Sequence, residues 1–136
     1  MILILDASAA VRAAFEADNP RWRLPIEQAD LILAPDLLPA EAANAFWKYV
    51  RAGQLKRDSA ANLLRSALEL VDEYRSVHEL ALEAFDLGVL MDRPVYDLVY
   101  LAMARRHSAC LLTADDKLRV AADRIGIRIA EAAEVS

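Results

Sequence analysis

Short apolar runs alternate along the chain with longer segments in which apolar residues recur every three or four positions. Three of the runs, 2–5, 31–34 and 109–112, have the length of a β-strand. A run that is apolar throughout is typical of a strand covered on both faces, whereas the longer segments have the period of an amphipathic helix. This alternation predicts an α/β domain with a mostly parallel central sheet flanked by helices.

Turn-forming residues divide the rest of the chain into further elements. The predicted helices cover 6–17, 21–29, 37–52, 56–70, 76–87, 94–106 and 114–125, and two shorter predicted strands cover 70–74 and 127–129. We expect Gly53, Gly88 and Gly126 to end helices, because glycine readily takes the left-handed conformation that closes them. Thr113 is expected to cap the last helix.

The composition predicts a single folded domain over residues 1–136. The chain is 57% hydrophobic and 27% charged with only three glycines, which excludes a disordered or low-complexity protein. A chain of this length needs no disulfide to fold, and its single cysteine cannot form one within the chain, which fits a reducing, cytoplasmic location. No apolar run approaches the length of a membrane span, and there is no signal-peptide pattern.

The net charge limits the kinds of nucleic-acid interaction to expect. A charge of −5 argues against a nonspecific nucleic-acid coat protein, which would be basic. It does not exclude an enzyme that acts on nucleic acid through bound metal ions. Acidic residues gathered at one site lower the net charge and create a cation site at the same time.

Four acidic residues lie where predicted strands end or predicted helices begin. Asp6 follows the first apolar run, and Asp115 follows the third. Glu41 lies in the first turns of the helix after the second run, and Asp97 lies in the first turn of the helix after Pro94. The carboxyl ends of parallel strands share one edge of the sheet, so Asp6, Glu41 and Asp115 are expected there. Asp97 joins them if the start of its helix faces the same edge.

Each acid, taken alone, is equally well explained as a helix cap, because carboxylates accept hydrogen bonds from the free N–H groups of a first turn. Capping fits Asp36 and Asp116 best, and neither is assigned to the core of the site. Asp6 ends an apolar strand, and Glu41 and Asp97 lie in otherwise apolar segments. A charge is costly in such a setting unless it is paired or bound to a metal, which favours a common site.

A cluster of carboxylates restricts the chemistry that it can perform. Two carboxylates about 4 Å apart repel each other by about 4 kcal/mol at an effective dielectric constant of about 20. The natural counter-ion is a hard divalent cation with oxygen ligands, such as Mg²⁺ or Mn²⁺. Such an ion polarises a phosphoryl oxygen and generates hydroxide from water. The acids therefore predict metal-dependent hydrolysis of phosphodiester bonds.

Other catalytic chemistry has little support in the sequence. His78 and His107 lack the Gly-x-Ser-x-Gly motif of a serine hydrolase, and we expect both at the surface. Cys110 lies in an apolar strand and is expected to be buried and inert. Two alternatives stay open. One is a receiver-like phosphotransfer domain, for which Asp36 and Lys117 are poorly placed. The other is a non-catalytic binding module whose acids only cap helices.

The sequence resembles the PIN domain family and, within it, the VapC-type toxin ribonucleases. The resemblance extends over almost the whole chain and rests on the order and spacing of four segments, 5–8, 38–45, 96–104 and 112–118. It implies a three-layer fold with a central, mostly parallel sheet of about five strands flanked by helices. It also implies a Mg²⁺- or Mn²⁺-dependent endoribonuclease that hydrolyses RNA.

The resemblance assigns roles to individual residues. Four acids fall on the metal-binding and catalytic positions of the family: Asp6, Glu41, Asp97 and Asp115. Three polar residues match its supporting positions: Ser8, Asn44 and Thr113. Asn44, three residues after Glu41, is expected to orient that carboxylate or a bound water. We expect Thr113 to hydrogen-bond Asp6 or to hold the turn before Asp115.

The resemblance also implies partners. VapC-type toxins are usually encoded with a VapB-type antitoxin that blocks the acidic site, often with a basic side chain. The apolar helices of 37–70 are expected to offer a groove for such a segment or a surface for a homodimer. At the site itself, Arg12 is a candidate contact to an RNA phosphate, and Asp116 is a candidate for a further metal contact.

Overall fold

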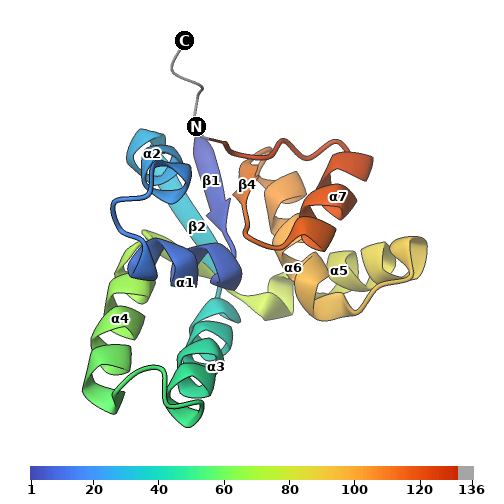
Figure 1. Cartoon of the computed structure of the whole chain (residues 1–136). Coiled ribbons are helices and arrows are strands. Elements are labelled where there is room, and N and C mark those ends of the chain that lie inside the picture. The colour runs from blue at the N-terminus through green and yellow to red at the C-terminus, as the bar shows by residue number, and fades with distance from the viewer. Residues whose placement is uncertain (132–136) are drawn as a thin grey trace.

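The structure is a computed structural model that describes residues 1–131, and it is built around one parallel sheet. The strands are β1 (Ile2–Leu5), β2 (Leu31–Pro35), β3 (Glu73–Arg75) and β4 (Cys110–Leu112), in the order β3-β2-β1-β4 (Figure 1). β1 lies between β2 and β4, so that Leu3 is beside both Ile32 and Cys110. The first apolar run thus forms a central strand covered on both faces.

Helices connect the strands and cover both faces of the sheet. They are α1 (Ala7–Phe15), α2 (Pro20–Gln28), α3 (Leu38–Arg51), α4 (Arg57–Glu69), α5 (Val77–Met91), α6 (Val95–Arg106) and α7 (Asp116–Arg124). Leu3 and Leu5 pack on the side of α1 to α4, whereas Ile4 packs on the side of α5 to α7. The alternation of side chains along β1 therefore supplies two cores. The predicted three-layer α/β fold is confirmed.

The helices predicted at 37–52 and 56–70 form a hairpin that extends from the sheet (Figure 1). α1 packs against both α3 and α4. The buried apolar residues of this hairpin belong to the core on that side, and they include Phe46, Ala60 and Ala67. Part of the apolar face of these two helices is therefore used inside the fold. No helix within residues 1–131 is long and apolar enough to cross a membrane.

The sheet has four strands rather than about five. The segment expected as the last strand makes a single parallel bridge, from Ile129 to Leu111. Leu111 donates to the carbonyl oxygen of Arg128 at 2.9 Å and accepts from the amide of Ala130 at 2.8 Å. β4 is only three residues long, and the pairing does not extend beyond its middle residue. The last predicted strand is thus reduced to one bridge.

The strand predicted at 70–74 begins later, at Glu73, and forms the exposed edge strand β3. Leu70 closes α4 and therefore cannot begin a strand. Asp72 then pairs with Ile32 in place of a regular ladder residue. Its amide donates to the Ile32 carbonyl oxygen at 2.9 Å, and its carboxylate accepts from the Ile32 amide at 2.8 Å.

Gly88 does not end α5, contrary to the prediction. The helix continues to Met91 and ends at Asp92, whose φ of 51° is left-handed. A Cβ atom on Gly88 would lie 3.2 Å from the carbonyl oxygen of Arg93 and 3.3 Å from Cγ2 of Val95. The glycine therefore allows the chain after the helix to fold back against it. This close approach places the start of α6 beside α5.

Candidate functional site

Asp6 is held at the carboxyl end of β1 by three hydrogen bonds. It is 4% exposed and caps the start of α1. Its Oδ1 accepts from the Ala9 amide at 2.8 Å and from the Ser8 hydroxyl at 2.7 Å, and its Oδ2 accepts from the Thr113 hydroxyl. A buried carboxylate with donors on both oxygens is fixed in one orientation.

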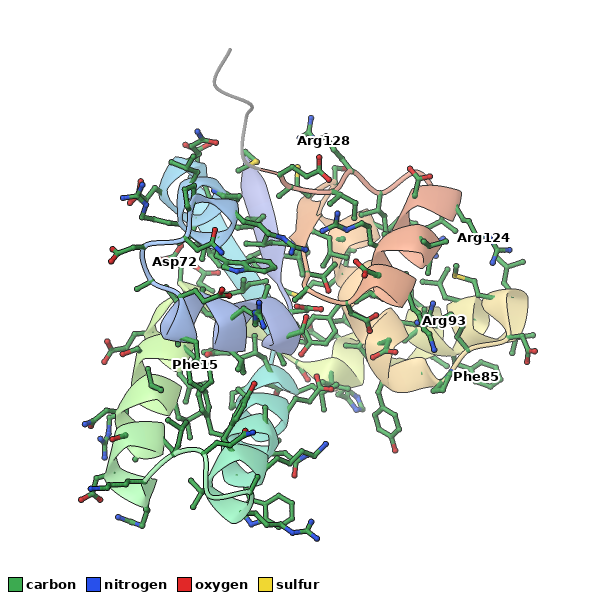
Figure 2. All side chains as sticks on the ribbon, in the orientation of Figure 1. Phe15, Asp72, Phe85, Arg93, Arg124 and Arg128 are labelled. Carbon is green, nitrogen blue, oxygen red and sulfur yellow. The ribbon has the colours of Figure 1, made fainter. Side chains whose placement is uncertain are left out.

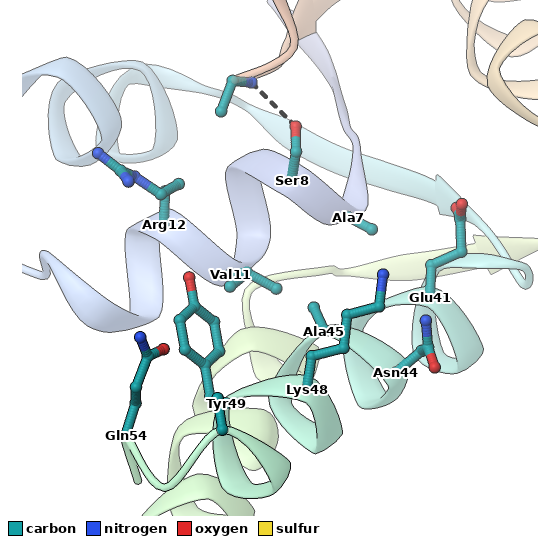
Figure 3. A pocket seen from close by; sticks show the side chains of 12 residues that line it. Ala7, Ser8, Val11, Arg12, Glu41, Asn44, Ala45, Lys48, Tyr49 and Gln54 are labelled. Atoms are coloured by element: carbon teal, nitrogen blue, oxygen red, sulfur yellow. Dashed lines mark hydrogen bonds between the residues drawn. The ribbon is translucent and has the colours of Figure 1, made fainter.

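Thr113 joins the end of β4 to the end of β1. Its buried hydroxyl donates to Asp6 and accepts from the Asp115 amide at 3.0 Å, so both contacts expected of it are present. Ser8 accepts from the Ala114 amide at 3.0 Å, across the same gap (Figure 3). The prediction that Thr113 caps α7 is wrong. Because its hydroxyl is engaged by Asp6, the cap is Asp115, which accepts from two amides of α7 at 2.9 and 3.3 Å.

Glu41 and Asp97 lie in the first turns of α3 and α6, and each has a defined partner. The Tyr100 hydroxyl donates to Glu41 Oε1 at 2.6 Å, and Tyr100 is 2% exposed. Arg93 forms an ion pair with Asp97, with 3.6 Å between Nη2 and Oδ2. Arg93 also donates to the carbonyl oxygen of Lys117 at 2.8 Å, and it lies between α6 and α7 (Figure 2).

Burial and neighbouring charges raise the pKa values of groups on this edge. Burial raises the pKa of Asp6 from 3.8 to about 6, its hydrogen bonds oppose the rise, and the charge of Asp115 adds to it. Burial also raises the pKa of Glu41, the bond from Tyr100 opposes it, and the charge of Asp97 adds to it. The pKa of Tyr100 is raised by burial, by its bond to Glu41 and by the charges of Glu41 and Asp6. The acids thus form two interacting pairs, with Tyr100 between them.

The four acids share one edge of the sheet, but they are not arranged as a complete set of metal ligands. No group of three or more His, Cys, Asp or Glu side chains within residues 1–131 is arranged to hold a metal ion. The donors are all carboxylate oxygens, which Mg²⁺ and Mn²⁺ prefer. Among the described residues, Arg93 is the one cation that forms an ion pair with any of these acids. A divalent cation would balance the remaining negative charge.

The other predicted site residues lie around this edge without bonding to its acids. Asn44 is exposed one turn after Glu41 on α3. Arg12 pairs with Glu16, with 2.8 Å between Nε and Oε2. Asp116 is exposed in the first turn of α7. Within residues 1–131, no hydrogen bond joins Asn44, Arg12 or Asp116 to the four acids, so any role for them requires a ligand.

Sequence reasoning did not assign Tyr100 and Arg93 to the site. The available signal is helical spacing, because residues three or four positions apart share a helix face. Tyr100 is three residues after Asp97 on α6, so this spacing places it near Asp97, but it does not identify Glu41 as its partner. Arg93 precedes α6, which begins at Val95, so helical spacing does not place it.

A groove of about 660 Å³ opens from this edge and runs between α1 and α3 (Figure 3). We call it the α1–α3 groove. Ser8 and Glu41, which is one of the four acids, line it at the edge of the sheet. Arg12, Lys48 and Gln54 also line it. The acidic edge therefore opens into a space whose walls carry polar and cationic side chains.

Comparisons with known proteins place the chain among relatives that match it over most of its length. The PIN domain family model matches residues 3–124. Ribonuclease VapC3 from Pyrobaculum aerophilum is 34% identical over 121 residues, which cover 87% of this chain and 92% of that protein.

Two solved structures share the architecture. The crystal structure of PAE2754 from Pyrobaculum aerophilum matches with a TM-score of 0.73 and 26% identity, covering 89% of this chain and 79% of that chain. The crystal structure of VapBC2 from Rickettsia felis, bound to a DNA fragment from the promoter, matches with a TM-score of 0.69 and 18% identity. The match covers 96% of this chain and 98% of that chain. At that identity the second likeness concerns the fold alone. The resemblance seen in the sequence is confirmed, and the chain belongs to the PIN domain family.

Proposed function

We propose that this chain is a metal-dependent endoribonuclease of the VapC type, which hydrolyses phosphodiester bonds in RNA. The observation that carries the proposal is the buried Asp6 carboxylate, oriented by three donors and repelled by Asp115. A carboxylate that is both fixed and repelled is characteristic of a functional site, where a cation balances it. The similarity to a ribonuclease of the same family supports RNA as the substrate.

Asp6, Glu41, Asp97 and Asp115 would hold Mg²⁺ or Mn²⁺, because their oxygen donors and excess negative charge fit such an ion. When bound, the ion supplies charge stabilisation at the phosphoryl oxygen and lowers the pKa of the attacking water. The protein supplies positioning. Tyr100, whose pKa is raised, keeps its proton and holds Glu41 Oε1, while the hydroxyl donors keep both Asp6 oxygens in place.

The two alternatives are not supported. A receiver-like phosphotransfer domain needs a free aspartate after a middle strand, but Asp36 follows β2 and its Oδ1 accepts from the Val77 amide at 3.0 Å. The contact is to the first residue of α5, so Asp36 does not cap α3, the helix that follows it, and that expectation is wrong. A non-catalytic module would explain Asp115 as a cap, but it does not explain why Glu41 and Asp97, which cap nothing through their side chains, share this edge.

The test is cleavage of RNA by the purified protein with Mg²⁺ or Mn²⁺, with a chelator, and with the variants Asp6→Asn and Asp97→Asn. We expect cleavage to require the ion and to fall by at least about a hundredfold in both variants. The matched control is Asp36→Asn, which also changes an acid at a helix start. It should remain active, because the amide oxygen of asparagine can accept the same bond from the Val77 amide, and Asp36 has no hydrogen bond with the four acids among the described residues. Undiminished cleavage by Asp6→Asn would refute the proposal.

We also propose that a VapB-type antitoxin binds the protein and blocks the acidic edge. The support is the fold shared with VapBC2 from Rickettsia felis and the negative charge of the edge, which fits a basic segment. The groove predicted along 37–70 corresponds in part to the α1–α3 groove, which α3 lines from Glu41 onward. Cleavage should stop when the antitoxin is added. We also propose a cytoplasmic location, which an RNA substrate and such a partner would support and which fits the single buried Cys110.

We propose further that the chain forms a homodimer through α5. Leu82, Phe85, Val89 and Leu90 are exposed by 80, 56, 71 and 70%, and Phe85 lies on the outside of the molecule (Figure 2). A contiguous apolar face of this kind marks an interaction site, and the same face of a second copy would cover it. Leu82→Glu should give a monomer in analytical ultracentrifugation, whereas Val120→Glu, at a 61% exposed position on α7, should not. A monomeric wild type would contradict this assembly.

A further inference from the structure

The α1–α3 groove has a wall that the proposed chemistry does not use. Glu41 and Lys48 both line this groove, seven residues apart on α3, which is two turns of helix. Seven residues of α-helix span about 10 Å. The Lys48 ammonium lies on the same side of α3 as Glu41 (Figure 3). A positive charge is therefore present in the same groove as Glu41, on a residue whose backbone lies about 10 Å farther along α3.

Lys48 differs from the other cation of the groove in its charge balance. Arg12, on α1, is paired with Glu16 at 2.8 Å. Lys48 forms no ion pair within residues 1–131. The helix dipole favours a cation in the last turns of α3, but it does not select the face on which the cation lies. Lys48 therefore gives the groove a positive charge that no ion pair within residues 1–131 balances.

The lining of the groove favours a polyanionic chain over a helical peptide. Ala7, Val11, Ala45 and Tyr49 make part of the groove apolar, and polar or cationic side chains lie along the rest of it: Ser8, Arg12, Asn44, Lys48 and Gln54. An amphipathic helix binds through its apolar anchors and would leave these polar and cationic groups unused. A nucleic-acid strand is held mainly through its phosphates, by cations along its path.

We propose that the α1–α3 groove binds the backbone of single-stranded RNA on one side of the scissile bond, with Lys48 contacting a neighbouring phosphate. This inference rests on the proposed nuclease function, and it adds the path that the substrate takes away from the acids. Lys48 is a binding residue for the strand and takes no part in the hydrolysis. Asn44 and Gln54 line the same groove and offer hydrogen-bonding groups to ribose or base.

The test compares Lys48→Met with Lys56→Met, which removes the same charge from the exposed residue that precedes α4, outside the groove. KM and kcat for a single-stranded RNA are measured over a range of salt concentrations. We expect Lys48→Met to raise KM on the order of tenfold at unchanged kcat. It should also reduce the slope of log KM against log salt by about 0.7, the value for one lost contact to a single strand. Lys56→Met should do neither.

Equal KM values and equal salt slopes in the two variants would overturn the inference. A fall in kcat with an unchanged slope would also overturn it, because it would indicate a structural role for Lys48. So would a loss of antitoxin affinity without a change in KM, which would assign the groove to a protein partner.

The proposed function can fail separately from this inference. It fails if the wild type does not cut RNA under any metal condition. Equilibrium binding of intact RNA, measured by fluorescence anisotropy with a chelator present, then tests whether the groove binds RNA, independently of cleavage. Equal affinities and slopes for the two variants, or no binding by the wild type, would overturn the inference there too.

Discussion

Replacing Asp6 with asparagine should stabilise the metal-free protein at neutral pH. Asp6 is 4% exposed, and burial is the main reason that its pKa rises from 3.8 to about 6. At about 1.4 kcal/mol per pKa unit, this rise corresponds to about 3 kcal/mol. That is the order of magnitude of the free energy by which folding disfavours the charged form of Asp6. Asparagine has nearly the same shape and carries no charge.

The sign of the pH dependence follows from proton binding. Because the pKa of Asp6 is higher in the folded protein, the folded state binds more protons than the unfolded chain between about pH 4 and about pH 6. The contribution of Asp6 to stability is therefore fully present below about pH 4 and is lost as the pH rises through about 6. The pKa of Glu41 is also raised, but Glu41 is present in both proteins, so the difference between them isolates Asp6.

Urea unfolding in the presence of a chelator measures this difference, with the fluorescence of the buried Trp22 as the probe. From about pH 4.5 to about pH 7.5, the free energy of unfolding of the wild type should fall by about 2 kcal/mol relative to Asp6→Asn, because about 1 kcal/mol of the total is already lost at pH 4.5. Thr113→Val removes a hydrogen bond that lowers the pKa of Asp6, so the fall should then extend to a higher pH and become larger. A difference that stays constant within about 0.5 kcal/mol would refute the reasoning.

Three further predictions concern the edge and its supports. Tyr100→Phe removes the 2.6 Å hydrogen bond that lowers the pKa of Glu41, so the acid limb of the pH–rate profile should move to higher pH. An unchanged profile would contradict a role for Tyr100 in setting the pKa of Glu41. Gly88→Ala should lower the free energy of unfolding in urea, because its Cβ would lie 3.2 Å from a backbone oxygen. This close contact should outweigh the gain of about 1 kcal/mol from helix propensity. A more stable variant would show that the chain at Arg93 moves to make room. Mg²⁺ or Mn²⁺ should raise the melting temperature of the wild type and Asp36→Asn more than that of Asp97→Asn, and equal shifts would count against a shared metal site.

The elements that could be predicted from the sequence are those with one physical explanation. A four-residue run that is apolar throughout is too short for a helix and too apolar for a loop, so 2–5 and 109–112 predict β1 and β4 closely. Gly53 and Gly126 were expected to close helices, and their φ values of 74° and 77° are left-handed. These features depend on local conformation, which neighbouring residues decide.

The elements that could not be predicted depend on distant parts of the chain. Gly88 has the same sequence signal as the glycines that close helices, but it lies inside α5 because the chain at Arg93 and Val95 passes close to it. The segment 127–129 has a strand pattern, but it pairs only at Leu111 of the short β4. Neither outcome follows from a local pattern.

The location of the acids was predictable for a topological reason, whereas their partners were not. Asp6 and Asp115 follow β1 and β4, and these strands are neighbours in a parallel sheet, so their carboxyl ends share one edge. The bond from Tyr100 to Glu41 joins residues 59 positions apart on different helices. Such a contact depends on the packing angle between α3 and α6, which a single sequence does not reveal.

The acids that would bind a cation and the lysine that would attract an RNA phosphate are different residues. Burial and the charge of Asp115 oppose a negative charge on Asp6, while hydrogen bonds favour that charge and hold its direction. A cation that binds the folded edge and not the unfolded chain would therefore offset much of the cost of about 3 kcal/mol, so that ion binding and folding are linked. RNA is repelled by the same acids until the ion is present, whereas Lys48 attracts a phosphate without it. Capture of the strand and cleavage of the bond thus depend on different charges, and each can be removed without the other.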